Sequence, residues 1–394
     1  MAHRLVQRGH DAVVLTGLPN YPSGVIAPEY RGKAWRLSFG ELLDGIKVAR
    51  VILYPSHSKD GNRRLANYFS FAASGSLRSV ALRGVDVVVA TSPPLTAGLP
   101  AWLAATTNRA PLVMELRDLW PEAAIQLGYL RGPVARRAAY ALERFLYRQA
   151  TSIVSVSNGI RQDIVDRGVP ADKCAVLFNG IDPQLFSPQA RNNHVEALKA
   201  EGRVVGLYMG SLSAYHGLEL ALDLLSQLQP YDRFRVLFAG GGSARPALEE
   251  AVRHRGLSNA IFLPSPSRVE MPGLAASADF CLAFVKQSQF SRWLLSSKVF
   301  MYMACGRPIF AAAAGETRSV IEEARAGIVV EPTPDGVACL AQTLLQMPDG
   351  SRFAQFGANG RRYVEESHSW DTVATSYEQI LLRAIAQQWQ RRDV

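Results

Sequence analysis

Residues 295–311 read LSSKVFMYMACGRPIFA, and this stretch combines a short helix with the strand that follows it. Its two serines can cap a helix start, and Gly306 followed by Pro308 ends the helix before an apolar strand. Lys298 falls in the first turn, where the helix dipole favours an acidic side chain over a basic one. A lysine placed among free backbone amides predicts an anion site, such as one for phosphate, with an incidental surface lysine as the alternative.

The same alternation of strand and helix runs through the whole chain. Short apolar runs rich in β-branched residues alternate with longer amphipathic runs, which predicts parallel sheets with helices on both faces. The predicted strands of the first half are residues 12–16, 47–53, 85–90, 111–116, 151–156 and 174–178. Those of the second half are residues 204–209, 234–239, 260–263, 279–284, 308–312 and 327–331. We therefore predict two doubly wound, Rossmann-like domains that face a cleft, where such folds bind their ligands.

The turn-rich sequence NGIDP at residues 179–183 marks the predicted domain boundary. Residues 1–182 then form an N-terminal domain, residues 183–369 a C-terminal domain, and residues 370–394 a helix that packs back toward the first domain. Residues 1–9 already read as a helix, whereas a doubly wound domain normally opens on a strand. We therefore expect the N-terminal domain to be truncated at its start and to lack its first strand.

The composition is that of a soluble globular protein, because 48% of the 394 residues are apolar and 20% are charged. No apolar run reaches the ~18 residues of a membrane-spanning helix, and the first residues lack the apolar core of a signal peptide. These features predict a cytoplasmic location. The cysteines lie far apart within apolar runs, as expected of small core residues, and are Cys174, Cys281, Cys305 and Cys339.

The net charge of +9 is concentrated in the first domain, where residues 1–182 hold 22 Lys and Arg against 14 Asp and Glu. This excess predicts an anionic membrane surface as a partner, with a merely solvated basic face as the alternative. No recognition helix, aromatic RNA-binding motif or zinc-finger spacing accompanies the charge. Nucleic acid is therefore not an expected partner.

Residues 204–217, VVGLYMGSLSAYHG, read as a strand, a turn of small residues and a helix start. Gly210 lets the backbone approach a ligand, and the amides near His216 and Gly217 can hold a pyrophosphate. A tight connection without a ligand is the alternative. The glycines at 240–242 lack the G-x-G-x-x-G spacing and the acidic residue that follows it, which disfavours a nicotinamide enzyme.

Residues 115–122, ELRDLWPE, place four charged groups and a tryptophan at the carboxyl end of a predicted strand. Such a cluster would be costly to bury without purpose, so it predicts a polar site. The alternative is an internal ion pair between Arg117 and an acid. The sequence holds no G-x-S-x-G, no H-E-x-x-H and no metal-spaced histidines, so hydrolase and metalloenzyme functions have no support.

The order of these motifs resembles that of the family 4 retaining glycosyltransferases. More narrowly, it resembles the bacterial fucosaminyl and colanic-acid-type transferases of capsule and O-antigen assembly. The matching segments are LVQRGHDAVVLTG at 5–17, PNYPSG at 19–24, RDLWP at 117–121, NGID at 179–182, Gly210 with His216-Gly217, and SK at 297–298 through GRP at 306–308. The resemblance implies a GT-B fold and a retaining hexosyltransferase that needs no metal or other cofactor. Its nucleotide-sugar donor, expected to be UDP-linked, is held by the C-terminal domain.

The resemblance also implies, position by position, which residues form the site. The implied donor-binding residues are Gly210, Ser211, His216, Gly217, Gly242, Ser297, Lys298 and Glu316. The implied catalytic residues are Asp118, Arg117 and Glu122, and the implied acceptor-binding residues are Asn20, Tyr21 and Gly24. In this arrangement Lys298 stabilises the leaving phosphate and Asp118 faces the acceptor hydroxyl.

The chain departs from the family pattern at the donor site. The glutamate that is common three residues after the lysine is Met301 here, and the one eight positions earlier is Trp293. The basic residues usual between Gly210 and Gly217 are also missing. We therefore expect altered or weakened donor binding.

The function predicted from the sequence is a cytoplasmic glycosyltransferase, peripheral at the inner face of the membrane. It would move a sugar, such as an N-acetylated amino or deoxy sugar, from a nucleotide-sugar to a lipid-linked acceptor of lipopolysaccharide, capsule or exopolysaccharide. Two alternatives remain open. One is a sugar-nucleotide epimerase on the same fold, and the other is a non-catalytic homologue that acts as a binding or assembly partner.

Overall fold

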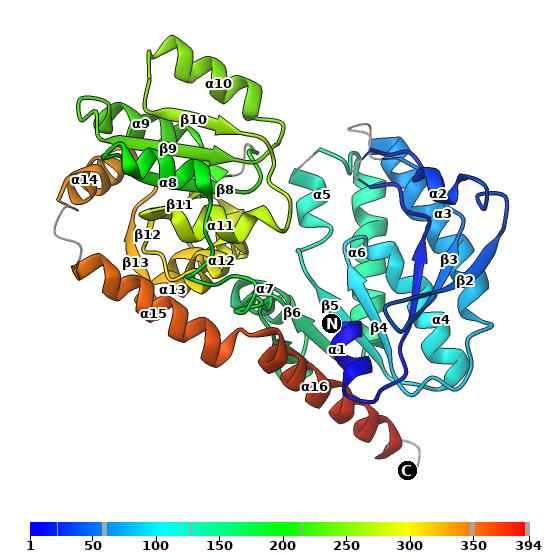
Figure 1. The fold of residues 1–394 in the computed structure, drawn as a ribbon. Coiled ribbons are helices and arrows are strands. Elements are labelled where there is room, and N and C mark those ends of the chain that lie inside the picture. Colours follow the sequence, from blue (N-terminus) through cyan, green and yellow to red (C-terminus); the bar gives the residue numbers. More distant parts are fainter. Residues whose placement is uncertain (22, 57–60, 127, 214–215, 347–350, 391–394) are drawn as a thin grey trace. The chain divides into compact units, whose positions relative to one another are not determined.

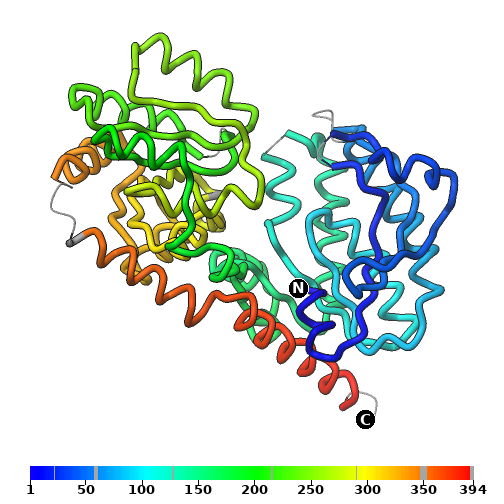
Figure 2. The backbone as a smooth tube through the Cα atoms, viewed as in Figure 1, coloured from blue at the N-terminus to red at the C-terminus, as the bar shows by residue number. Residues whose placement is uncertain are grey.

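The computed structural model describes residues 1–21, 23–56, 61–126, 128–213, 216–346 and 351–390. The chain forms two compact units, Met1–Phe178 together with Val373–Val394 (unit 1) and Asn179–Thr372 (unit 2). Unit 1 thus contains both ends of the chain. In Figure 2 the red C-terminal end of the tube runs beside the blue N-terminal turn, and Arg8 there donates a 2.8 Å hydrogen bond to Glu378.

Unit 1 holds two β-sheets (Figure 1). The first has the order β1-β3-β2 and consists of β1 (Val13–Gly17), β3 (Ile46–Val51) and β2 (Ser38–Leu43). The second is parallel, with the order β4 (Val88–Ser92), β5 (Leu112–Leu116), β6 (Ser152–Ser155) and β7 (Cys174–Val176). No strand precedes β1 among the residues described, and the expected missing first strand stays a prediction.

Strand β2 is the one strand of unit 1 that the sequence pattern did not predict. It pairs antiparallel with β3 at the edge of its sheet. Its sequence, SFGELL, has no β-branched residue, and its two leucines are exposed. An edge strand of this kind lacks the buried apolar run by which strands of a parallel sheet are recognised.

Helices surround both sheets of unit 1. They are α1 (Ala2–Gln7), α2 (Pro28–Arg31), α3 (Gly61–Ser79), α4 (Gly98–Asn108), α5 (Glu122–Gln126), α6 (Pro133–Gln149), α7 (Asn158–Asp166) and α16 (Trp370–Gln390), with short 3₁₀ turns at Leu95–Ala97 and Ala171–Lys173. On α16, the side chains of Tyr377, Leu381 and Ala384 form one buried cluster with Val113 of β5 and Val154 of β6. The C-terminal helix is therefore part of the core of unit 1.

Unit 2 is built on one six-stranded parallel sheet with the order β10-β9-β8-β11-β12-β13 (Figure 1). Its strands are β8 (Val204–Met209), β9 (Phe234–Ala239), β10 (Ala260–Leu263), β11 (Phe280–Val285), β12 (Ile309–Ala313) and β13 (Gly327–Val330). Its helices are α8 (Asn193–Ala200), α9 (Glu219–Leu228), α10 (Arg245–His254), α11 (Glu270–Ser277), α12 (Lys298–Ala304), α13 (Glu316–Glu323), α14 (Pro334–Leu345) and α15 (Ser351–Ser367), with a 3₁₀ turn at Gln289–Arg292. The prediction of two Rossmann-like α/β domains is confirmed.

The central strands of unit 2 are buried on both faces. Phe238, Phe280 and Phe310 are all fully buried, because helices cover each side of the sheet. In a parallel sheet of this type the loops that leave the carboxyl ends of the strands gather at one edge. The loops after β8, β9 and β12 therefore reach the same edge as the start of α12.

The prediction that the cysteines are small core residues is confirmed at three of the four positions. Cys174, Cys281 and Cys305 are buried, and all four thiols are free. Cys339 lies on α14 and is exposed, so its assignment to the core is wrong. The apolar run around it belongs to the inner face of an amphipathic helix, and Cys339 lies on the outer face.

Candidate functional site

Lys298 is the most unusual side chain at the carboxyl edge of the sheet in unit 2. It is the first residue of α12 and is only 7% exposed. Its Nζ has no hydrogen-bond partner among the described residues and lies 3.8 Å from the centroid of the Tyr208 ring. Burial lowers the pKa of Lys298 from 10.5 to about 7. A buried amine without a polar partner is costly, so an anion that entered here would be stabilised.

The turn after β8 lies directly against this lysine. Gly210 has a φ of +130°, and a Cβ at this position would lie 3.3 Å from Cε of Lys298. The hydroxyl of Tyr208 donates a 3.0 Å hydrogen bond to the carbonyl oxygen of Ser211. Tyr208 therefore contacts the lysine with its ring and fixes the turn with its hydroxyl. The structure brings together three features that the sequence analysis assigned to the donor: Gly210, Ser211 and Lys298.

A second glycine loop, after β9, packs against the first. A Cβ on Gly240 would lie 1.9 Å from the carbonyl oxygen of Gly210, and one on Gly242 would lie 2.2 Å from that of Leu212. The amide of Ala244 donates a 2.9 Å hydrogen bond to the same Leu212 oxygen. Only glycine permits so close an approach of two backbones, so Gly242 supports the donor turn rather than standing apart from it.

His216 and Gly217 complete the turn. Burial and the nearby Lys298 lower the pKa of His216 to about 4, so its imidazole is neutral at pH 7. Its Nδ1 is buried and has no hydrogen-bond partner within the described ranges. Gly217 has a φ of +60° and lies close to the backbone of Lys286. The intervening residues 214–215 of the predicted loop lie outside the described residues.

Ser297 and Glu316 lie at the starts of two neighbouring helices. Ser297 holds the N-cap position of α12, but its side chain makes no capping hydrogen bond, so the predicted serine cap is wrong. The amide of Ser296 instead donates a 3.1 Å hydrogen bond to the Thr317 hydroxyl on α13. The local chain direction is thus set by the contact between α12 and α13. Glu316, the first residue of α13, is buried beside this contact.

We expect Glu316 to accept the hydrogen bonds from the ribose hydroxyls of the nucleotide, which Met301 cannot accept. A carboxylate accepts charge-assisted hydrogen bonds worth roughly 1.5–3 kcal/mol each, whereas a thioether is a weak acceptor. Glu316→Gln should therefore weaken UDP binding about tenfold, or ~1.4 kcal/mol, and Met301→Glu should change it little. Calorimetry with UDP tests both, with Glu322→Gln on the exposed face of α13 as the control. A tenfold gain in Met301→Glu without any loss in Glu316→Gln would contradict this assignment.

In unit 1, Arg117 forms an ion pair. Its Nη1 lies 2.9 Å from Oε1 of Glu115, whose other oxygen is 3.3 Å from the hydroxyls of both Tyr377 and Thr91. The sequence left an internal ion pair of Arg117 open as the alternative for the 115–122 motif; the structure shows the pair, but with the Arg117 side chain 45% exposed. An ion pair this exposed contributes little to stability, and the assignment of Arg117 as a catalytic residue stays a prediction.

Of the acids in the 115–122 motif, Asp118 is the one that the described structure leaves without an ion pair. It follows β5, and its Oδ1 accepts a 2.9 Å hydrogen bond from the amide of Leu119. It has no ion pair in the described part of the chain, and its side chain is accessible to solvent. Partial desolvation nevertheless raises its pKa above the ordinary value. A carboxyl group of this kind is suited to accept a hydrogen bond or a proton from an acceptor hydroxyl.

Glu122 belongs to a buried ionic network rather than to an open site. It pairs with Arg167, which also contacts Asp163 at 2.6 Å and Glu143 at 3.8 Å. Its side chain is 12% exposed. Nothing in this geometry supports the implied catalytic role of Glu122. Its partners are far away in the sequence, which is why the motif alone did not reveal the network.

Glu143 allows the network to be tested through the pH dependence of the protein's stability. Burial and the nearby Glu122 raise the pKa of Glu143 from 4.5 to about 7. A raised carboxyl pKa contributes stability at low pH that is lost as the pH rises through about 7. Glu143→Gln, which mimics the protonated acid, should therefore raise the melting temperature at pH 8 by a few degrees, about what 1 kcal/mol gives, and leave it nearly unchanged at pH 5. The same change at both pH values would show that packing, not charge, is responsible.

The loop after β1 holds the implied acceptor residues. Asn20 donates a 2.9 Å hydrogen bond from Nδ2 to the Leu18 carbonyl and accepts a 2.7 Å bond from the Gly24 amide at its own carbonyl. Tyr21 is 79% exposed. Pro22 of this motif lies outside the described residues. The loop belongs to a different sheet from the one that carries Asp118, and the acceptor role of its residues stays a prediction.

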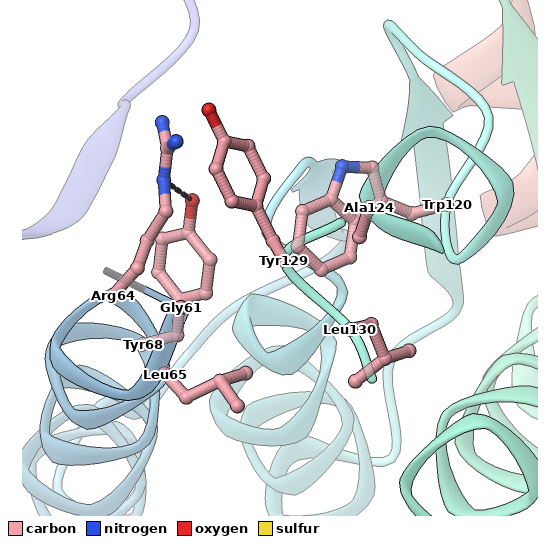
Figure 3. A pocket seen from close by; sticks show the side chains of 8 residues that line it. All are labelled: Gly61, Arg64, Leu65, Tyr68, Trp120, Ala124, Tyr129 and Leu130. Atoms are coloured by element: carbon pink, nitrogen blue, oxygen red, sulfur yellow. Dashed lines mark hydrogen bonds between the residues drawn. The ribbon is translucent and has the colours of Figure 1, made fainter. Parts of the chain in front are cut away.

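A pocket in unit 1 was not predicted from the sequence. It lies between the first turns of α3 and the segment that contains α5 and the turn after it (Figure 3). Its lining includes Arg64 and Tyr68 from α3 together with Trp120 and Tyr129. Trp120 of the 117–121 motif was the available signal, but its partners on α3 are more than 50 positions away in the sequence.

Two general expectations concern metals and membranes. Among the described residues, no group of three or more His, Cys, Asp or Glu side chains could hold a metal ion. In the same part of the chain, no helix has the length and apolar character needed to cross a bilayer. A reaction without a metal stays a prediction.

Both units match known protein families. Residues 1–180 match the glycosyl transferase 4-like domain, and residues 203–347 match the glycosyl transferases group 1 domain. Among relatives, the putative colanic acid biosynthesis glycosyl transferase WcaI of Escherichia coli K12 is 26% identical over 358 residues, covering 88% of this chain and 86% of its own. A GDP-mannose-dependent alpha-mannosyltransferase of Mycobacterium tuberculosis is 27% identical over 344 residues, covering 85% and 81%.

Solved structures share the fold. HepE of Anabaena in complex with UDP superposes with a TM-score of 0.69 at 17% identity, covering 94% of this chain and all of that one. WaaG, a glycosyltransferase involved in lipopolysaccharide biosynthesis, gives a TM-score of 0.64 at 17% identity, covering 95% and 92%. With both domains matched in order, and a shared architecture, the chain belongs to the family 4 type of GT-B glycosyltransferases.

Proposed function

We propose that the protein transfers a hexosyl group from a nucleoside diphosphate sugar to a lipid-linked acceptor during assembly of a surface polysaccharide, with retention of configuration. The observation that carries the proposal is the buried ammonium of Lys298, which lies under Gly210 without a polar partner in the described chain. A diphosphate would supply the missing anion, and the amides of the two glycine loops would supply further donors.

This geometry suits the departure of a nucleoside diphosphate. As the bond from the anomeric carbon to the diphosphate oxygen breaks, negative charge builds on the leaving phosphate. A buried ammonium therefore stabilises the transition state more than it stabilises the ground state. Stabilisation of this kind accelerates the reaction. The acceptor oxygen forms the new bond to the same carbon, and its proton passes to the leaving phosphate.

The names of relatives support a nucleotide-sugar donor and a polysaccharide product. HepE structures contain UDP and UDP-glucose, which favours a UDP-linked donor. The mycobacterial relative uses GDP-mannose, so the base needs a direct test. WcaI belongs to colanic acid synthesis and WaaG to lipopolysaccharide synthesis, which favours a product at the cell surface. The donor sugar, including an N-acetylated amino or deoxy sugar, is part of the proposal.

A lipid-linked acceptor would bring the protein to the inner face of the membrane from the cytoplasm. The excess of Lys and Arg in residues 1–182 would favour that surface by Coulomb attraction, which salt screens. Vesicles with anionic phospholipid should therefore bind the protein more tightly at low salt than at high salt. Binding that ignores salt would contradict this part of the proposal.

The central experiment compares lipid-linked sugars from cells with and without the protein by mass spectrometry. An intermediate that lacks one sugar in the deficient cells is the expected result. The mass difference identifies the sugar, and purified protein with UDP- and GDP-sugars then identifies the donor. An unchanged set of intermediates, together with no release of nucleotide in vitro, would reject the transferase function.

One observation favours a second candidate, a non-catalytic homologue that binds an assembly partner. The positions three after and five before Lys298 hold Met301 and Trp293, neither of which can accept hydrogen bonds from ribose hydroxyls as a carboxylate does. Calorimetry separates the candidates. A protein that binds neither UDP nor GDP would have lost its donor site, whereas measurable binding supports the enzyme.

A further inference from the structure

Helix α3 of unit 1 exposes an apolar stripe to solvent. Ala66, Phe69, Ala73, Leu77 and Val80 recur at intervals of three or four residues, so they share one face of the helix and of the residue that follows it. Phe69 is 57% exposed and Leu77 is 67% exposed. Such spacing normally marks the helix face that packs into the core, whereas the solvent face carries charged and polar residues. On α3 the solvent face is apolar instead, over about 21 Å of its length.

The opposite face of α3 supplies its packing. Ser74 and Gly75 are buried there, and a Cβ on Gly75 would lie 3.4 Å from Pro100 of α4. Ala73 and Leu77 are each two residues from Gly75, and two residues turn a helix by about 200°. They therefore point away from α4 and from the sheet. The inner face alone joins α3 to the core of unit 1, so the outer stripe is not explained by the packing of this unit.

The charge around the stripe has one sign. Residues 61–114, which contain α3 and α4, hold five arginines, no lysine and a single acid, Asp86. Arg78 and Arg83 lie near the end of the stripe, and neither forms an ion pair within the described ranges. A solvated helix would be expected to mix both signs of charge on its outer face. An apolar stripe next to unbalanced arginines instead suits a partner that is apolar and anionic.

Helix α6 adds a row of arginines to the same helical layer. Arg137, Arg144 and Arg148 are exposed, and their spacing of seven and four residues places them on one face. None of the three forms an ion pair in the part of the chain that the structure describes. Helix α4 contacts both α3 and α6 (Figure 1), and its Trp102 meets Phe145 of α6 edge to face with centroids 5.1 Å apart. The layer of α3, α4 and α6 thus presents an apolar stripe and a basic row.

We propose that the protein docks on an anionic membrane with the outer stripe of α3 and the arginine row of α6. The apolar side chains would enter the headgroup region, and the guanidinium groups would bind lipid phosphates. A second copy of the chain fits less well. An isologous dimer would bring this surface against itself, so arginines would meet arginines. The inference rests on the proposed function, which brings the protein to a lipid-linked acceptor, and adds the surface by which it arrives.

Ala73, in the middle of the stripe, allows a test in both directions. Cosedimentation of the full chain with vesicles of phosphatidylglycerol and phosphatidylcholine measures the affinity. Ala73→Leu should tighten binding about threefold, because more apolar area enters the interface. Ala73→Glu should weaken it about tenfold, because a carboxylate would be brought against anionic lipid. Both new residues favour a helix, so opposite effects at one exposed position would not arise from unfolding.

The apolar and the basic parts of the surface can be separated by salt. The double variant Phe69→Ser with Leu77→Ser should weaken binding at least tenfold at both low and high salt, because burial of apolar area is not screened. Its control removes two exposed apolar side chains from unit 2, Tyr231→Ser with Val269→Ser, and should change the affinity less than twofold.

The arginine row is tested in the same way. Arg144→Gln with Arg148→Gln should weaken binding about tenfold at low salt and less than twofold at high salt, because salt screens the charge that these variants remove. The control, Arg268→Gln with Arg362→Gln, removes two exposed arginines from unit 2 and should change the affinity less than twofold at either salt concentration. Equal losses in the two arginine variants would mean that only net charge is sensed, and the docking surface would be rejected.

Sedimentation velocity without lipid tests the other occupant of the stripe. A wild-type dimer that Phe69→Ser with Leu77→Ser converts to a monomer would show that a second copy covers α3, and the membrane proposal would be wrong. Circular dichroism should show the same melting temperature for these variants as for the wild type within a few degrees. A protein that transfers sugar but ignores the vesicles would keep the transferase function and lose this inference. One that binds vesicles through α3 but releases no nucleotide from any donor would keep the docking surface and lose the transferase function.

Discussion

Replacing Lys298 with alanine should lower the rate of sugar transfer about 100-fold or more, since removing one preorganised charge-stabilising donor costs roughly 10²–10³ in rate. The ammonium is the one buried cation that the described structure places under the donor turn, 3.8 Å from the Tyr208 ring. Its effect should fall mainly on kcat, because charge on the leaving phosphate grows toward the transition state. Steady-state kinetics with the donor identified above measures both parameters.

The pH dependence of nucleotide binding gives an independent view of the same lysine. Burial sets the pKa of Lys298 at about 7 in the empty protein. A bound diphosphate favours the ammonium, so the protein should take up a proton on binding above pH 7. Affinity for UDP should therefore fall as the pH rises from 7 to 9. Calorimetry at pH 8 in buffers of different ionisation enthalpy measures that proton, which Lys298→Ala should not take up.

Two further variants test whether the lost activity comes from the charge of Lys298 or from lost packing or general charge. Lys298→Met keeps most of the side-chain volume and should lose activity as Lys298→Ala does, although it retains the packing. Lys199→Ala removes a lysine that pairs with Asp279 at 3.0 Å, at the amino end of β11, and should leave transfer unchanged. Full activity in Lys298→Met would show that no charge is needed at this position.

The central strands of unit 2 could be predicted to within about one residue because they are buried on both faces. β8 and β9 have the predicted bounds, since a continuous apolar run ends where the chain leaves the sheet. The same reasoning fails for β2 at the edge of its sheet, where Leu42 and Leu43 are exposed. β10 is also an edge strand and half-buried, but it could be predicted because its sequence, AIFL, is apolar throughout.

The features of the candidate site also divide into those that the local sequence reveals and those that depend on distant segments. Lys298 and the glycine turns were recognisable because each is a local exception, a base at a helix start or a glycine at a strand end. Interactions between distant segments were not. The contact of Lys298 with Tyr208 joins residues 90 positions apart in the sequence, and the network around Glu122 reaches Arg167. Sequence motifs thus located the groups, while the structure shows which of them are already paired.

Replacing Gly242 with alanine should weaken UDP binding about 100-fold, although Gly242 carries no side chain that could touch the ligand. Its φ of +152° is strained for alanine, and the new Cβ would lie 2.2 Å from the Leu212 carbonyl oxygen. The strain is worth about 1–3 kcal/mol, and the Leu212–Ala244 hydrogen bond adds about 1 kcal/mol. The free protein can relax by moving the loop away. Donor binding must restore the original turn, so most of that cost, roughly 2.8 kcal/mol, appears as lost affinity.

Gly256→Ala is the matched control for this prediction. Gly256 also lies in unit 2 with a positive φ of +65°, but an added Cβ there would meet nothing within 4 Å. It should lower the melting temperature slightly through backbone strain and leave UDP affinity within a factor of two. If both variants lost affinity equally, strain in unit 2 as a whole would explain the effect. If Gly242→Ala bound UDP normally, the contact between the two glycine loops would have no part in shaping the donor turn, and Lys298 would have to hold the diphosphate without it.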